Sequence, residues 1–167
     1  MLEHRGAILE TARAVSNLLR EHHIRGAIIG GIAVVLNGHL RTTRDVDVWV
    51  ADRLDGFADI LRAAGATYEP AKREFLLNGI AIHLVPDDLA QPEPRRLIEI
   101  DGITTVTLGD LINMKLRSGL RNLARSQDIA DVIGLIRQHQ LGKEFAAKID
   151  KKYRVDFRKL VEAAMKR

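Results

Sequence analysis

Two aspartates in a valine-rich stretch constrain this chain more than any other feature. Asp45 and Asp47 belong to "DVDVWV", whose alternating, β-branched residues predict a strand. Side chains at i and i+2 point to the same face of a strand, so the two carboxylates project together and repel each other. A cation would relieve this repulsion, and carboxylate oxygens suit Mg²⁺ or Mn²⁺. We therefore predict that both aspartates are metal ligands and catalytic residues.

Other roles for the two aspartates stay open at this point. Asp45 stands at the start of the predicted strand, where a carboxylate can cap a turn. Asp47 lies inside the strand, where a structural aspartate needs a hydrogen-bonding partner. The metal role explains both residues at once.

A glycine pair precedes the aspartates. Gly30 and Gly31 separate a short apolar strand from an apolar run that predicts a helix over 31–38. The backbone N–H groups at the start of a helix attract anions such as phosphate. Arg41, Thr42 and Thr43, in the loop "RTTR", would add further phosphate donors. A tight turn is the alternative role of the glycines, but a phosphate site beside a metal site is what phosphoryl transfer requires.

Three common motifs are absent from this region. The stretch "GGIAVVLNG" does not match the GxGxxG of a dinucleotide-binding turn, and no GK[ST] follows it as in a P-loop. The residues after the aspartates also lack the oxygen ligands and glycine of a calcium-binding loop.

The remaining pattern predicts an α+β fold. Helical spacing appears over 7–22, 54–65, from 108 and over 126–139, and strands are expected at 27–30, 46–50 and 103–108. Asn78-Gly79 between two apolar runs predicts a β-hairpin. We expect residues 1–107 to form the α/β core and residues 108–167 a C-terminal helical segment packed on it, together one compact domain.

Composition narrows the cellular setting and the partners. The chain has no cysteine, which excludes disulfides, a thiolate nucleophile and a zinc finger. No apolar stretch approaches the roughly 20 residues of a membrane span, so we expect a cytoplasmic protein with no membrane partner. Residues 143–167 hold nine Lys/Arg and four Asp/Glu, a net of +5. This basic tail is either a solvated amphipathic helix or a surface for a polyanion such as RNA.

The order Gly-Gly, short helix, "RTTRD" and Asp-x-Asp resembles the nucleotidyltransferase fold of the polymerase-beta-like superfamily. It is most similar to the prokaryotic branch that includes abortive-infection and toxin–antitoxin nucleotidyltransferases. The resemblance implies a mixed β-sheet flanked by helices, with a C-terminal helical segment. It also implies metal-dependent transfer of an NMP from an NTP to an acceptor hydroxyl on RNA or protein, with Mg²⁺ or Mn²⁺ as cofactor and an antitoxin as a partner.

The same resemblance implies roles for individual residues. Gly30 and Gly31 would hold the triphosphate, and Asp45 and Asp47 would bind the metal. The segments "LGDLINMKLRSG" and "RSQDIADVIGLI" are similar to the helical part of that branch, where Lys115 would approach the nucleotide. A solvated helix residue is the other interpretation of this lysine.

His83 departs from the pattern of that superfamily. A third carboxylate is expected in the strand "GIAIHLVP", and the matching position is His83. A neutral imidazole brings no negative charge to a metal site, although Asp87 and Asp88 follow closely. We treat His83 as a candidate catalytic residue, while an ordinary core or surface histidine is the alternative. The competing functional hypotheses are a catalytically degenerate nucleotide- or partner-binding module and a nucleic-acid-binding scaffold.

Asp128 and Asp131 lie near a predicted helix start after Ser126. Carboxylates are favourable there because of the helix dipole. We therefore expect structural roles for these two aspartates.

Overall fold

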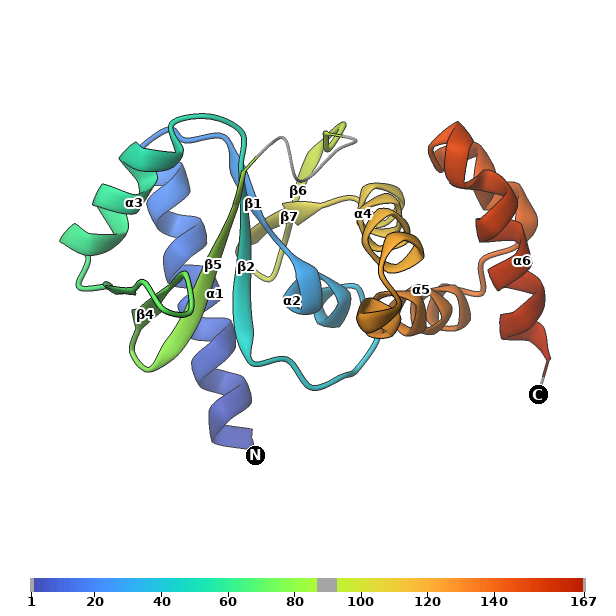
Figure 1. Ribbon diagram of the computed structural model, residues 1–167, viewed down its shortest axis with the longest axis horizontal. Helices are drawn as coiled ribbons and strands as arrows, with labels where there is room; N and C mark the ends of the chain where they lie inside the picture. Colours follow the sequence, from blue (N-terminus) through green and yellow to red (C-terminus); the bar gives the residue numbers. More distant parts are fainter. Residues whose placement is uncertain (1, 87–92, 167) are drawn as a thin grey trace.

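A seven-stranded mixed sheet forms the centre of the computed structural model, which describes residues 2–86 and 93–166, with side chains from residue 6 onward. The strand order is β3-β4-β5-β2-β1-β7-β6 (Figure 1). The strands are β1 (Gly26–Ile29), β2 (Asp45–Val50), β3 (Thr67–Glu69), β4 (Glu74–Leu77), β5 (Ile80–Pro86), β6 (Leu97–Ile100) and β7 (Ile103–Val106).

Strand β2, which contains both aspartates, lies in the middle of the sheet. It runs antiparallel to β1 and parallel to β5. Strand β4 joins β5 in an antiparallel hairpin, and β3 extends that edge. On the other side β7 runs parallel to β1 and antiparallel to β6. Both aspartates therefore lie on a central strand, with β1 on one side and β5 on the other.

The helices cover both faces of the sheet. Figure 1 shows α1 and α3 on one face and α2, α4 and α5 on the other, with α6 farthest from the sheet. Among the described residues, no helix combines the length and apolarity that crossing a bilayer requires. The helices are α1 (Leu2–Glu21), α2 (Gly30–Leu36), α3 (Leu54–Ala63), α4 (Leu108–Arg121), α5 (Ser126–His139) and α6 (Arg154–Met165), with 3₁₀ turns η2 (Leu123–Arg125), η3 (Lys143–Lys148) and η4 (Lys151–Tyr153).

The alternation of β2 decides which face its aspartates share. Val46, Val48 and Val50 are buried in the cluster beneath α1 and α3. Trp49, at the alternate position, is buried in the opposite cluster, which also contains residues of α2, α4, α5 and α6. Because side chains alternate along a strand, Asp45 and Asp47 face the same side as Trp49. The carboxylate pair thus opens toward α2 and the C-terminal helices.

The structure confirms the predicted α+β class with a mixed sheet, flanking helices and C-terminal helices. The predicted hairpin is present: Asn78 and Gly79 both have positive φ, as a type I′ turn requires. Two strands, β3 and β6, were not predicted. Helix α6 is the amphipathic helix that was one of the two interpretations of the basic tail, and it packs Phe157 and Val161 into the core.

Candidate active site

The first half of the site is a close approach between Gly30 and Asp47. Strand β1 ends at Ile29, which pairs with Asp47 of β2, and α2 begins at Gly30 with φ of +67°. A Cβ atom at position 30 would overlap Oδ2 of Asp47. Glycine is needed here both for its left-handed backbone and for this contact. The Asp47 carboxylate therefore lies directly against the backbone at the start of α2.

The second half is a row of three polar residues across three neighbouring strands. The parallel register of β2 and β5 pairs Asp47 with His83. The hairpin register places Phe75 opposite Ile82, which puts Glu74 beside His83. Nδ1 of His83 lies 3.2 Å from Oδ1 of Asp47, and its Nε2 lies 3.0 Å from Oε2 of Glu74. A histidine ring thus bridges two carboxylates.

The charge of His83 follows from these contacts. Its hydrogen bond to Asp47 raises the pKa of His83, partial burial opposes this, and Glu74 and Asp45 raise it further, to about 9. At neutral pH the ring is an imidazolium, with both N–H groups donating to carboxylates. The repulsion expected between Asp45 and Asp47 is therefore offset in part by a cation from the protein itself.

Oδ2 of Asp47 and the carboxylate of Asp45 remain available for a ligand. His83 contacts Oδ1 of Asp47 and leaves Oδ2 toward Gly30. Among residues 6–86 and 93–166, no side chain is hydrogen-bonded to or ion-paired with the Asp45 carboxylate. These oxygens are hard donors of the kind that divalent cations prefer.

The donor set fits one metal ion that arrives with phosphate. Within the described part of the chain, no three His, Cys, Asp or Glu side chains are arranged to hold a metal. Mg²⁺ commonly binds through one or two carboxylates and completes its coordination with substrate phosphates and water. Asp45 and Asp47 fit that mode. Protonated His83 cannot act as a ligand, and Asp87 and Asp88 lie outside the described residues.

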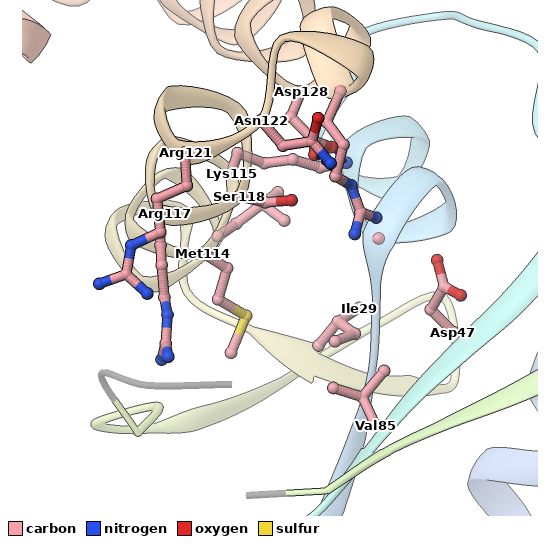
Figure 2. Close-up of a pocket in the computed structure, with 13 residues that line it drawn as sticks. Ile29, Asp47, Val85, Met114, Lys115, Arg117, Ser118, Arg121, Asn122 and Asp128 are labelled. Carbon is pink, nitrogen blue, oxygen red and sulfur yellow. Dashed lines mark hydrogen bonds and ion pairs between the residues drawn. The ribbon is translucent and has the colours of Figure 1, made fainter. Parts of the chain in front are cut away.

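A cleft of about 470 Å³ opens beside this row. Its apolar floor is formed by side chains of β1, β5 and α4, and four cationic side chains line it, three from α4 and one from η2. In Figure 2, Arg117 and Arg121 lie at one end of the cleft and Asp47 at the other, with Met114, Ile29 and Val85 between them. The lining residues are Ile29, Gly30, Asp47, Val85, Leu111, Met114, Lys115, Arg117, Ser118, Arg121, Asn122, Arg125 and Asp128.

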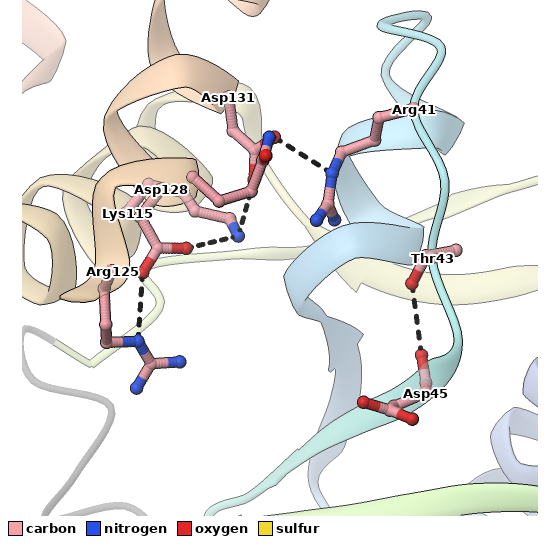
Figure 3. A network of polar contacts seen from close by, with 8 residues as sticks. Arg41, Thr43, Asp45, Lys115, Arg125, Asp128 and Asp131 are labelled. Atoms are coloured by element: carbon pink, nitrogen blue, oxygen red, sulfur yellow. Dashed lines mark hydrogen bonds and ion pairs between the residues drawn. The ribbon is translucent and has the colours of Figure 1, made fainter.

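A buried ion-pair network holds one wall of the cleft (Figure 3). Nζ of Lys115 lies 2.8 Å from Oδ1 of Asp128 and 2.9 Å from Oδ2 of Asp131. Arg125 and Arg41 approach the same two carboxylates at 3.2 and 3.1 Å. Burial alone would raise the pKa of Asp128, but the hydrogen bond and charge of Lys115, together with Ser118 and Arg125, lower that pKa overall. Two carboxylates therefore organise three cations.

The "RTTR" loop lies between this network and the aspartates. Arg41 pairs with Asp131, and its Nη1 occupies the space that a side chain at Gly31 would fill. Thr43 also lies against Gly31 and donates a hydrogen bond to the carbonyl oxygen of Asp45 at 3.4 Å. Thr42 is exposed. Two of the three loop residues predicted to bind phosphate are thus beside the start of α2.

The structure brings together most of the residues singled out from the sequence. Gly30, Asp47 and Lys115 line one cleft, and Gly31 contacts the loop beside it. Asp128 and Asp131 have the structural role expected of them, although their partner is Lys115 and not only the helix dipole. Whether Lys115 also contacts a nucleotide stays a prediction.

Sequence reasoning missed Glu74 and the cleft arginines. The hairpin register was available, because a two-residue turn at Asn78-Gly79 places Glu74 opposite His83 by counting outward. Arg117 and Arg121 are four residues apart, which is the spacing of one helix face, and Arg125 follows in η2. Only the chain path shows that this face lines a cleft.

Three solved structures share this architecture. The antigenic nucleotidyltransferase-like protein of Paracoccidioides brasiliensis is 16% identical, with a TM-score of 0.61, over 92% of this chain and 87% of its own. The antibiotic-resistance factor ANT(2″)-Ia is 15% identical, with a TM-score of 0.62, over 96% of this chain and 95% of its own. A Thermotoga maritima protein, provisionally assigned as a nucleotidyltransferase, is 17% identical, with a TM-score of 0.54, over 74% of this chain and 91% of its own.

No family model and no curated protein matches the chain by sequence. At such low identities the structural similarity establishes the fold alone. The chain has a nucleotidyltransferase-like fold.

Proposed function

We propose that the cleft binds a nucleoside triphosphate and transfers its nucleotidyl group to an acceptor hydroxyl. One observation carries this proposal: a carboxylate pair adjoins a glycine turn at one end of a cation-lined cleft. An anionic substrate suits the cations, and the carboxylates suit a divalent metal that travels with it. The acceptor oxygen would bond to the α-phosphorus, the bond from that phosphorus to the bridging oxygen would break, and pyrophosphate would leave while the hydroxyl proton passes to solvent.

The roles of the chain's own residues follow from their positions. Asp45 and Asp47 would hold Mg²⁺ or Mn²⁺, which when bound offsets phosphate charge. Gly30 lines the cleft at the start of α2, where the triphosphate would lie, and Gly31 lies beneath Arg41 and Thr43, which would reach the phosphates. His83 fixes Asp47 by a hydrogen bond to one oxygen and leaves the other free.

The arginines at the far end of the cleft favour RNA as the acceptor. Arg117 and Arg121 lie one helical turn apart on α4 and both line the cleft away from Asp47. Guanidinium groups bind phosphate with paired hydrogen bonds. A nucleic-acid acceptor has a phosphate at every residue, whereas a protein or small-molecule hydroxyl does not supply one. Membership of the toxin–antitoxin branch, an antitoxin partner and a cytoplasmic location stay predictions.

A second candidate function is a nucleotide-binding module without catalysis. His83 supports it, because both ring nitrogens contact carboxylates at the position where a third carboxylate was expected. Such a protein would bind an NTP and signal its presence to a partner.

Transfer of label from α-³²P NTPs tests both candidates. Wild type and Asp45→Asn would be incubated with Mg²⁺ or Mn²⁺ and with either total cellular RNA or total cellular protein. We expect label on RNA with wild type and none with the variant. Label on protein would contradict the RNA assignment. NTP binding without transfer under either metal would support the module and contradict the enzyme.

A further inference from the structure

The loop between α2 and β2 lies along one face of α5, although about 90 residues separate the two segments in sequence. Four contacts join the two segments, which run in opposite directions: as the loop advances along the chain, its contacts move back along α5. They are the carbonyl of Asn37 with Nε2 of His139 at 2.6 Å, Gly38 against the Gln138 side chain, the His39 ring against Gly134, and Arg41 with Asp131 at 3.1 Å.

The α5 side of this contact is one continuous stripe. Asp131, Gly134 and Gln138 follow i, i+3, i+7 spacing, which places them on the same helix face. At the centre of the stripe, a Cβ atom on Gly134 would overlap three atoms of the His39 ring. The absence of a side chain at this position therefore lets the loop approach the helix backbone.

Docking of the loop determines where Arg41 lies. Asp131 is fully buried and holds Nε of Arg41. Nη1 of the same guanidinium stands over Gly31, at the start of α2. An arginine on an undocked loop would have to order its long side chain upon binding phosphate, at an entropic cost.

We propose that Gly134 and His39 are positioning residues that preorganise Arg41 for the triphosphate. This inference rests on the proposed NTP binding. Neither residue lines the cleft; both would act through the loop. Alanine at position 134 should displace the His39 ring and loosen Arg41, even though alanine is a better helix former than glycine.

A double-mutant cycle tests the coupling. The dissociation constants of the four Mg²⁺–NTPs would be measured by calorimetry for wild type, Gly134→Ala, Arg41→Ala and the double variant. We expect Gly134→Ala to weaken the tightest NTP about tenfold, the scale of one charge-assisted hydrogen bond. In the Arg41→Ala background, Gly134→Ala should have no further effect, because its effect passes through Arg41.

Gly56→Ala is the matched control, because Gly56 is also helical, in α3, and a Cβ there meets only one atom at 3.8 Å. It should leave NTP binding unchanged. If Gly134→Ala fails to fold, His39→Ala removes the same contact from the other side and should give the same tenfold loss. Wild-type affinity in both variants, or additive losses in the cycle, would overturn the positioning role while leaving the proposed function intact. A wild type that binds no NTP would overturn both.

Discussion

Nδ1 of His83 lies 3.2 Å from Oδ1 of Asp47, in register across two parallel strands. The other ring nitrogen contacts Glu74, which is 12% exposed on its side chain. The sequence predicted a metal ion as the only positive charge beside the two aspartates. In the structure, the His83 imidazolium also supplies positive charge there. Asp45 and Asp47 consequently differ: Asp47 has a partner within the protein, and Asp45 has none among the described side chains.

The His83 bridge should make stability depend on pH in the alkaline range. Its pKa is about 9 in the folded protein and 6.5 ordinarily. Protonated His83 stabilises the folded protein through its two carboxylate contacts. This contribution is fully present below about pH 6.5 and is lost as pH rises through about 9. Wild type should therefore melt higher than His83→Gln near pH 6, with the difference shrinking toward pH 10 or so. A difference that is constant across this range would contradict the bridge.

The two aspartates should respond differently to neutralisation. Asp47→Asn weakens the contact with His83, so we expect a loss of about 0.5–1 kcal/mol in unfolding free energy, as for partly exposed ion pairs. Asp45→Asn removes the repulsion from Asp47 together with a weaker attraction to the His83 imidazolium, so the stability of the metal-free protein should change little. Urea denaturation of both variants at neutral pH measures this. Equal losses would contradict the asymmetry.

Replacing Gly30 with alanine should destabilise the protein more than replacing Gly79, which also has positive φ but has no neighbouring atom where a Cβ would lie. Gly79 has φ of +76° and no atom within 4 Å of the place that a Cβ would occupy, whereas a Cβ on Gly30 overlaps Asp47. Both changes carry the strain of a left-handed alanine, about 1–2 kcal/mol. The overlap should add about 1–3 kcal/mol for Gly30→Ala. Chemical denaturation of the two variants should show that gap, and equal losses would mean that Asp47 moves away freely.

Lys115 should be far more important for stability than an exposed lysine. Lys115→Met would leave Asp128 without its main cation and Asp131 with only Arg41 and the Gln127 amide among the described side chains. Breaking such a buried pair costs about 3–5 kcal/mol. Lys159→Met, at an exposed position of α6, should change the unfolding free energy by less than about 0.5 kcal/mol. Similar small effects for both would show that the network is not essential to the fold.

Much of the fold could be predicted from local sequence. Period-2 alternation and the Asn78-Gly79 turn predicted β2, β4 and β5, and helical spacing predicted α1, α3, α4 and α5. Strand β6 was missed although Asp101-Gly102 carries the same turn signal, with both residues at positive φ. Strand β3 has only three residues, too few for a periodic pattern.

The part of the candidate site that comes from one short segment of sequence could be predicted. Asp45, Asp47 and the glycine pair belong to one short segment. The Lys115 network depends on which face of α4 meets α5, and the loop docking depends on which face of α5 meets the loop. These contacts join segments far apart in sequence, so local patterns do not reveal them. The pKa of His83 likewise depends on Asp47 and Glu74, which come from different strands.

Metal-dependent NTP binding is the decisive test of the proposed site. Calorimetric titration of wild type and Asp45→Asn with each NTP, with and without Mg²⁺, separates the metal site from the rest of the fold, because Asp45 has no structural partner among the described side chains. We predict that wild type binds an NTP more tightly with Mg²⁺ than without it, and that Asp45→Asn loses this metal-dependent gain while it keeps its melting temperature. A wild type that binds no NTP, or binds it equally well without metal and in the variant, would contradict the metal–nucleotide site.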